Sequence, residues 1–361
     1  MLPHSAVARI IVSSGILGSI IIGSGFFASV GGGMQEHSVG ASSPSSVVPR
    51  QGVPSGIAKL PPQGWPDTAS AASLYPGGVW LNPETIPVTE VGKLRTAGNA
   101  ADADALSQIS SQPIATWLGD WWGSDLLKRK LAANTAAAEL ARTTPVYVIY
   151  AIPDRDCGGY SAGGYNDEDY LTFNRTVADS LRGHPAVMLI EPDSIAMLGT
   201  ERCGSIVDRR LGLLSTVVQY YSQAGIPVYL DGGNSKWVDP QTMADRLTKA
   251  GVQYARGFFT NVSNFRLTAD EKQYAEKLSR LLGGKHYVID VSRNGAGWKG
   301  TWCNPTGAAL GQNPMVSRTG GSMDALLWVK TPGVSDGTCN GGPAAGKWFP
   351  TYALDLVRAR P

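Results

Sequence analysis

The sequence of residues 146–156 is VYVIYAIPDRD, and the sequence of residues 186–194 is AVMLIEPDS. In both stretches a short apolar run with β-branched residues leads into a cluster of carboxylates. Apolar runs of this length are typical of strands buried on both faces of a parallel sheet. The two stretches therefore predict strands that carry polar side chains at their carboxyl ends.

The same pattern recurs along the chain and predicts an α/β fold. We count seven apolar runs, at residues 115–119, 146–152, 186–192, 228–233, 256–263, 286–292 and 325–330. Between them lie segments with apolar residues at helical spacing, such as residues 127–142, 168–182, 206–224 and 269–282. Strands that alternate with helices indicate β/α repeats, so we expect a closed or nearly closed β/α barrel.

The chain is expected to contain three segments. In residues 1–30, Arg9 precedes a long apolar run, which predicts an export signal; an uncleaved membrane anchor is the alternative. Residues 31–63 are rich in glycine, serine and proline and predict a flexible linker. Residues 64–361 keep a globular composition without a second linker, so we expect a single domain there. The protein should be secreted and extracellular, or anchored to the cell envelope.

Charge and cysteine content narrow the function further. The 31 lysines and arginines nearly balance 29 aspartates and glutamates, so the overall charge attracts neither nucleic acid nor anionic lipid. Four cysteines in an exported chain predict two disulfides, and pairing Cys157 with Cys203 and Cys303 with Cys339 closes the shorter loops. Free buried thiols are the alternative. A metal site is disfavoured because there is no C-x-x-C pair and the four histidines are scattered.

Polar and aromatic side chains follow nearly every expected strand. The clusters contain Trp117, Tyr150, Asp154, Arg155, Asp156, Glu191, Asp193, Asp231, Asn234, Asn261, Asn264, Asp290, Arg293, Lys330 and Asp336. Since the carboxyl ends of barrel strands form one face, these clusters should converge on one site. A single aspartate at such a place is as well explained by a helix cap, but several on one face indicate a functional site.

The residue types at this face favour acid and base chemistry on a sugar. Cleavage of a glycosidic bond needs a protonated carboxyl for the leaving oxygen and an ionised group that activates water. Tryptophan rings stack on the apolar faces of pyranose rings. A metallohydrolase would need ligand spacing such as H-E-x-x-H, and phosphoryl transfer would need a glycine-rich loop that opens a helix; neither is present in the sequence.

Two long motifs resemble a known family. Residues 150–157 (YAIPDRDC) with residues 161–164 (SAGG) are similar to the first signature of glycoside hydrolase family 6, and residues 189–194 (LIEPDS) to the second. Further similar segments are YLDGG at 229–233, Trp237, NVSN at 261–264, SRNG at 292–295, WCN at 302–304 and WVK at 328–330. The resemblance runs from about Tyr75 to the C-terminus. It implies a single catalytic domain, a distorted, TIM-like barrel of seven parallel strands, and hydrolysis with inversion at the anomeric carbon.

The resemblance also implies catalytic roles. Asp193 matches the general acid, whose pKa must be raised, and Asp156 matches the neighbouring carboxylate that raises it. Tyr150 matches a tyrosine that crowds the sugar at the point of cleavage. Asp336 matches the family's proposed base, which acts directly or through a water chain; a turn residue in the Asp336-Gly337 pair is the alternative.

Other residues match the family's binding positions. The positions that match substrate-binding residues are Trp117, Ser161, Asp231, Trp237, Asn264, Trp302 and Lys330, although each tryptophan is alternatively explained by core packing. The four cysteines match the family's two disulfides in the local pairing. Two positions depart from the family: Asn234 replaces a frequent histidine, and Val334 replaces a frequent glutamate.

The function that follows is an endo-β-1,4-glucanase, a cellulase. Two long loops roof the cleft of the family's cellobiohydrolases, whereas residues 336–348 and the segment after Cys157 are short here, so we expect an open groove and internal cleavage. The expected partner is a β-1,4-glucan or cello-oligosaccharide, bound by a monomer that needs no cofactor or metal. The alternatives are a catalytically weakened β-glucan-binding protein and a hydrolase of another β-linked glucan.

Overall fold

The computed structural model describes residues 69–361, which belong to one compact unit. The expected export signal at 1–30 and linker at 31–63 lie outside the described residues, as does the start of the expected domain at 64–68. No helix within residues 69–361 is long and apolar enough to cross a membrane.

One mostly parallel sheet forms the centre of this unit. Its strands are β1 (Thr116–Leu118), β2 (Val146–Ile149), β3 (Val187–Ile190), β4 (Val228–Asp231), β5 (Gly257–Thr260), β6 (His286–Asp290), β7 (Met315–Val316) and β8 (Met323–Leu327). The sheet order is β1-β2-β3-β4-β5-β6-β8-β7, with β7 antiparallel to β8. Each of the seven predicted runs overlaps one parallel strand. The sheet nevertheless has eight strands where seven were expected, because the two-residue β7 is too short to give a sequence signal.

The sheet curls into a half-barrel. Its two outer parallel strands meet at an isolated bridge between Ile114 and Trp328, just before β1 and just after β8. There the Ala115 amide donates to the Trp328 carbonyl at 3.0 Å, and the Trp117 indole Nε1 donates to the Val329 carbonyl at 2.9 Å. The expectation was a closed or nearly closed barrel; in the described residues no continuous ladder closes the sheet, and an isolated bridge joins these two edges.

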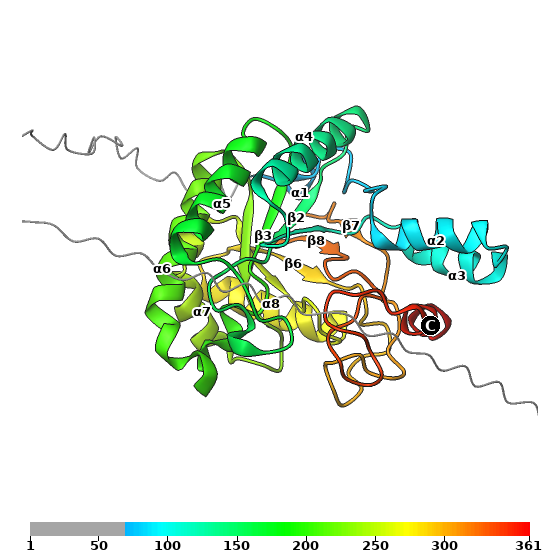
Figure 1. Ribbon diagram of the computed structural model, residues 1–361. Coiled ribbons are helices and arrows are strands. Elements are labelled where there is room, and N and C mark those ends of the chain that lie inside the picture. Colours follow the sequence, from blue (N-terminus) through cyan, green and yellow to red (C-terminus); the bar gives the residue numbers. More distant parts are fainter. Residues whose placement is uncertain (1–68) are drawn as a thin grey trace, which may run out of the picture. The chain divides into compact units, whose positions relative to one another are not determined.

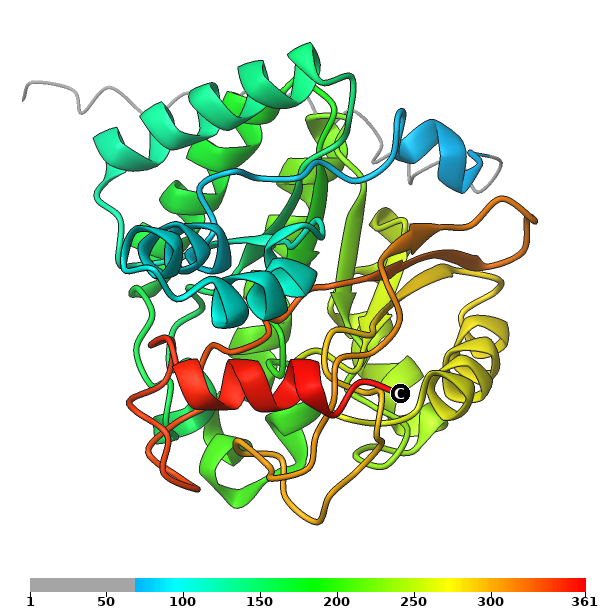
Figure 2. The same ribbon diagram turned by 90° about the vertical axis from the view of Figure 1, so that its right-hand side faces the viewer.

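The helices of the described residues are α1 (Ala71–Leu74), α2 (Ile86–Thr96), α3 (Ala100–Ser110), α4 (Ser124–Leu140), α5 (Asp167–Leu181), α6 (Val207–Gln223), α7 (Pro240–Lys249), α8 (Thr268–Leu281) and α9 (Pro350–Arg358). Three of these helices precede β1, helices α4 to α8 follow strands β1 to β5 in turn as expected for β/α repeats, and α9 follows β8. Helices α4 to α8 cover the outer face of the sheet (Figure 1). The final helix α9, red in Figure 2, packs against α3. Short 3-10 turns η1 (Asp156–Gly158), η2 (Ala196–Gly199), η3 (Glu201–Ile206) and η4 (Val252–Tyr254) complete the connections.

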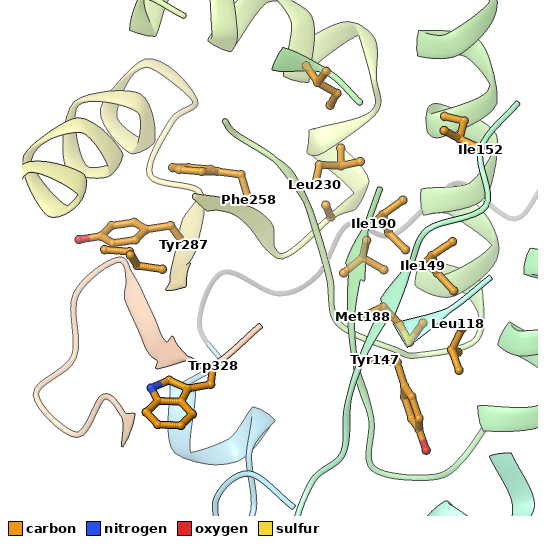
Figure 3. Packing of buried hydrophobic residues seen from close by; sticks show 14 of the residues in the cluster. Leu118, Tyr147, Ile149, Ile152, Met188, Ile190, Leu230, Phe258, Tyr287 and Trp328 are labelled. Carbon is orange, nitrogen blue, oxygen red and sulfur yellow. The ribbon is translucent and has the colours of Figure 1, made fainter. Parts of the chain in front are cut away.

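Two apolar clusters hold the sheet in place, one on each face. Alternate strand residues such as Ile149, Met188 and Ile190 join the cluster beneath the helices (Figure 3). Their neighbours in the strands, such as Leu189, point into the half-barrel and pack with Tyr75, which follows α1. Burial of both faces explains why the strand sequences are continuously apolar instead of alternating. The scaffold fixes the carboxyl ends of the strands at one edge.

Candidate active site

The structure brings the predicted carboxylates to this edge. Asp231 ends β4, whereas Asp156, Asp193 and Asp336 lie in the segments that follow β2, β3 and β8. The charges of Asp231, Asp156, Lys330 and Asp336 all act on the Asp193 carboxyl, which places the five groups in one cluster. Four carboxylates and one ammonium thus lie close together, with Asp231 and Asp336 buried and Asp156, Asp193 and Lys330 half-buried.

Asp193 is the carboxyl in this cluster that keeps its proton most strongly. Burial raises the pKa of Asp193 well above its usual range, and the negative charges of Asp231 and Asp156 raise it further. Lys330 opposes this effect, and Asp336 adds a smaller repulsion. Desolvation and like charges both disfavour ionisation, so Asp193 can carry a proton where an ordinary aspartate would not.

Asp231 is held by backbone groups. Its side chain is buried, with the residue 2% exposed. Oδ2 accepts hydrogen bonds from the Ile195 and Ala196 amides at 3.2 and 3.1 Å, and Oδ1 accepts one from the Gly233 amide at 2.9 Å. Burial raises the pKa of Asp231 to about 6 although these amides lower it. Asp231 therefore ties the segment after Asp193 to β4 and sets a negative charge near Asp193.

Tyr150, Ser161 and Asp156 form a hydrogen-bonded chain. The Tyr150 hydroxyl lies 2.8 Å from Ser161 Oγ. The Ser161 amide and hydroxyl both donate to Asp156 Oδ2, at 2.8 and 2.9 Å. Burial and the charges of Asp193 and Asp156 raise the pKa of Tyr150, so the phenol stays neutral. Asp156 is thereby fixed with one oxygen bound to Ser161.

Arg155 holds this loop together, a role that the sequence analysis missed. Its guanidinium donates to Asp120 Oδ1 at 2.7 Å, to the Tyr150 carbonyl at 2.8 Å and to the Ser161 carbonyl at 2.8 Å. It also lies over the Tyr150 ring, 4.8 Å from the ring centroid. Asp120 Oδ2 accepts the Gly164 amide at 2.9 Å. Arg155 was in the quoted motif, but its partner Asp120 lies in a distant segment.

Asp336 is an ionised carboxylate bound by two cations. Its Oδ2 accepts from Arg293 Nη1 at 2.8 Å and from the Asn304 amide at 3.1 Å, and its Oδ1 lies 3.2 Å from Lys330 Nζ. Burial alone would raise the pKa of Asp336, but the charges of Arg293 and Lys330 hold this pKa below its usual range. Arg293 is the second functional residue that sequence reasoning left without a role, and the SRNG motif was its signal.

The predicted aromatic positions differ in exposure. Trp117 is half-buried and meets the Tyr150 ring edge-on, with ring centroids 5.2 Å apart. Trp237 and Trp302 are 38% and 45% exposed, which favours a binding surface over core packing for both. Asn264 is half-buried, and its side-chain amide donates to the carbonyl of Val262 in its own loop at 3.3 Å. Its contact in the structure is local.

An aromatic contact joins the two short loops beside the carboxylates. Tyr160, in the loop after Asp156, meets Trp302 with ring centroids 6.0 Å apart. The Tyr160 ring also lies against Gly337, where an added Cβ would come within 2.7 Å of it. The two disulfides anchor these loops, since the structure joins Cys157 to Cys203 and Cys303 to Cys339. This is the local pairing.

The two departures from the family pattern lie in ordered structure. Asn234 is buried, and its Oδ1 accepts the Lys236 amide at 3.1 Å. Val334 is buried and forms an antiparallel bridge with Trp348. Neither side chain interrupts the acid cluster or the contacts of Asp336.

The acidic segments share an uncommon backbone conformation. Asp156, Glu191 and Asp193 have φ angles of +57°, +55° and +71°, in the left-handed region that favours glycine. Such conformations cost free energy and persist where surrounding contacts impose them. Here the fully buried Glu191 supplies one such contact, because its carboxylate oxygens lie 3.0 and 3.1 Å from the Ala151 amide. The bond connects the end of β3 to the residue after Tyr150.

Sequence comparison identifies relatives along most of the chain. A family model described as glycosyl hydrolases family 6 matches residues 77–360. Endoglucanase A of Cellulomonas fimi is 44% identical over 272 residues, which cover 75% of this chain and 60% of the relative, so the chain spans less than two thirds of that protein. Endoglucanase 1 of Streptomyces halstedii is 35% identical over 302 residues, covering 81% of this chain and 92% of the relative.

Solved structures share the fold. The endoglucanase Cel6 from Mycobacterium tuberculosis, in complex with a thio-linked cellobioside derivative, superposes with a TM-score of 0.73 at 36% identity, covering 81% of this chain and 99% of that one. Cellobiohydrolase II from Humicola insolens, in complex with glucose and cellotetraose, gives a TM-score of 0.68 at 23% identity, covering 78% and 97%. The second likeness shows the fold alone.

Proposed function

The chain belongs to glycosyl hydrolase family 6, and on that premise we propose that it is an endo-β-1,4-glucanase that inverts the anomeric configuration. One observation carries the proposal: a carboxyl with a strongly raised pKa, Asp193, shares the carboxyl edge of the sheet with a carboxylate whose pKa is lowered, Asp336. Two carboxyl groups whose environments push their pKa values apart are what acid and base roles require. In this reading the seven parallel strands serve as the family's distorted, TIM-like barrel.

Asp193 acts as the general acid in this proposal. Its proton passes to the glycosidic oxygen as the bond from that oxygen to the anomeric carbon breaks, and water forms the new bond from the opposite face of the ring. Asp156 and Asp231 keep Asp193 protonated until the leaving oxygen accepts the proton. Tyr150, fixed by Ser161 and Arg155, crowds the sugar ring at the point of cleavage.

Asp336 is proposed to take up the water's proton through a second water. Arg293 and Lys330 bind the two oxygens of Asp336, which lowers its basicity and limits its direct contact with the attacking water. A second water relays the proton to Asp336, and the separation of roughly 6.5–9.5 Å between the carboxyls of inverting enzymes leaves room for the attacking water.

The substrate is proposed to be a β-1,4-glucan or cello-oligosaccharide. Trp117, Trp237 and Trp302 offer ring faces for the sugar units, and Lys330 and Asn264 offer hydrogen-bond donors. Asp231, committed to three backbone amides, acts on the site through its charge. The two disulfides fit an oxidising compartment, so we propose a secreted, extracellular monomer.

Proton NMR of cello-oligosaccharide hydrolysis tests this function. The newly formed reducing end should first appear as the α-anomer, and early products should come from bonds inside the oligosaccharide. A product that keeps the β configuration would overturn inversion as the mechanism. Release of cellobiose from one end alone would overturn internal cleavage.

A binding protein with weakened catalysis is the second candidate, favoured by Val334 and Asn234 at positions where the family often has ionisable residues. Calorimetry separates the two candidates. Heat of binding with cello-oligosaccharides, without release of reducing ends from the same samples, would support the second candidate. Because the acid cluster and Asp336 are intact, we expect turnover.

The pH dependence of turnover should report the charge of Asp156. Removing that charge with Asp156→Asn relieves repulsion on Asp193, so the pKa of Asp193 falls. Asp193 then loses its proton at lower pH, and the alkaline limb of the kcat profile should move to lower pH. Asn can keep the acceptor for Ser161, which limits structural damage. The profile is measured by reducing-end release on a soluble β-glucan.

Asp154→Asn is the matched control for this profile. Asp154 lies two residues away and pairs with Arg209 at 2.7 Å on the surface, and it is not among the largest influences on the pKa of Asp193. Its substitution should leave the alkaline limb in place. An unchanged profile in Asp156→Asn would show that Asp156 does not set the protonation of Asp193.

A further inference from the structure

Glu271 is a buried carboxylate that the proposed acid and base chemistry does not use. It lies in the first turn of α8 and is 0% exposed. Its Oε1 accepts the Ser235 amide at 2.8 Å, and the hydroxyls of Ser235 and Thr260 also face this carboxylate. Burying a carboxylate costs free energy, so this contact needs an explanation beyond filling space.

The bond to Ser235 joins α8 to the segment that carries Trp237. That segment follows β4, and Asn234 shapes a tight turn in it: the Trp237 amide donates to the Asn234 carbonyl at 3.1 Å. One turn after Glu271, the Tyr274 hydroxyl donates to the Gly232 carbonyl at 2.9 Å. Two hydrogen bonds from one face of α8 thus hold the segment that presents the half-exposed Trp237.

One side of Trp237 borders a pocket. A pocket of about 560 Å³ lies between this segment and α8, and its lining includes Trp237, Asp239, Asp270, Gln273, Tyr274 and Lys277. An indole beside an open pocket has room to change rotamer, because close packing does not confine it. Its orientation then depends on the backbone from Gly232 to Trp237, and therefore on the hydrogen bonds that fix this backbone.

The surroundings of Glu271 favour a tether over a proton-transfer group. Burial raises the pKa of Glu271, whereas the hydroxyl of Ser235, the amide of Ser235 and the hydroxyl of Thr260 lower it. These groups belong to the connection after β4 and to the end of β5. Glu271 thus faces the connection after β4 and the end of β5, and it is not among the largest influences on the pKa of Asp193.

We propose that Glu271 is a positioning residue that fixes the segment from Gly232 to Trp237 and thereby sets the affinity for the glucose units that stack on Trp237. This inference rests on the proposed glucanase function. It assigns to Glu271 an effect on glucan binding and no part in bond cleavage. The carboxylate acts through its acceptor oxygen, so an amide oxygen in the same place should substitute for it.

Kinetics with Glu271→Ala and Glu271→Gln test the proposal. Glu271→Ala should raise KM for cellohexaose about three- to tenfold with kcat nearly unchanged, the pattern of lost uniform binding. Glu271→Gln should restore most of the affinity, because its Oε1 can still accept the Ser235 amide. Equal losses in KM and kcat, or a Gln variant as weak as the Ala variant, would overturn the proposal.

A double-mutant cycle shows whether Glu271 acts through Trp237. In a Trp237→Ala background, Glu271→Ala should cause no further rise in KM, because the indole ring that Glu271 positions is already absent. Fully additive effects would overturn the proposal. Tyr221→Phe is a matched control, since it removes a buried 3.0 Å hydrogen bond to Asn174 between α6 and α5 and should leave KM unchanged.

Amide hydrogen exchange separates this inference from the proposed function. In Glu271→Ala the amides of residues 232–238 should exchange faster than in the wild type, whereas Tyr221→Phe should not change them. Unchanged exchange in Glu271→Ala overturns the tether, whatever the enzyme cleaves. Absence of glucan hydrolysis by the wild type, with faster exchange in the variant, overturns the proposed function and leaves the tether in place.

Discussion

Asp193→Ala should lower kcat on a soluble β-1,4-glucan by about 10²–10⁴-fold, the usual contribution of a positioned general acid. The structure gives the reason: Asp193 holds its proton because burial, Asp231 and Asp156 all disfavour its ionisation. Without that proton the leaving sugar must depart as an alkoxide. Release of reducing ends under saturating substrate measures the loss, and circular dichroism confirms the fold.

A substrate with an activated leaving group provides the control. A dinitrophenyl cellobioside needs no proton on its leaving oxygen, so Asp193→Ala should lose far less activity on it than on the glucan. An equal loss on both substrates would assign Asp193 a structural role. Undiminished turnover of the glucan would remove Asp193 from the mechanism altogether.

Asp336→Asn should destabilise the protein and lower its activity together. The variant leaves Arg293 and Lys330 buried without their carboxylate, and breaking a buried ion pair in this way costs about 3–5 kcal/mol. Loss of the proposed proton acceptor should also lower kcat by about 10²-fold or more. Urea unfolding measures the free energy of unfolding, and glucan hydrolysis at a temperature where the variant is folded measures kcat.

Asp324 offers a matched buried carboxylate away from the site. It binds Arg256 Nε at 2.9 Å and Nη2 at 3.0 Å and accepts the Tyr229 hydroxyl at 2.6 Å, near the amino end of β8. Asp324→Asn should lose a similar free energy of unfolding while kcat of the folded enzyme stays close to the wild-type value. Similar kcat losses in both variants would attribute the effect of Asp336 to stability alone.

Local sequence was sufficient to predict the parallel strands and the edge at which the carboxylates gather. The run from Val146 to Ile149 is apolar on both faces, and its polar continuation into Asp156 marks the carboxyl end. The two-residue β7 escaped prediction because its pairing with β8 comes from tertiary contact. The isolated bridge between Ile114 and Trp328 was not predicted, for the same reason.

Pairing between distant segments explains what the sequence could not reveal at the site. Asp120 and Arg155 are 35 residues apart in the sequence, and Arg293 and Asp336 are 43 residues apart. No local sequence pattern therefore predicts either ion pair. The position of Asp231 at the end of β4 was also predictable from the sequence. Its hydrogen bonds with three backbone amides were not, because they depend on how the segment after Asp193 folds over Asp231.

The left-handed backbone at Asp156, Glu191 and Asp193 implies a conflict between thermal stability and turnover. An L-residue with a side chain pays about 1–2 kcal/mol for this conformation, and glycine pays far less. Directed evolution that rewards survival at high temperature, without an activity screen, should therefore replace Asp193 with glycine, because Glu191 and Asp156 also hold the structure through their hydrogen bonds. The resulting proteins would unfold at a higher temperature and would no longer hydrolyse cellulose.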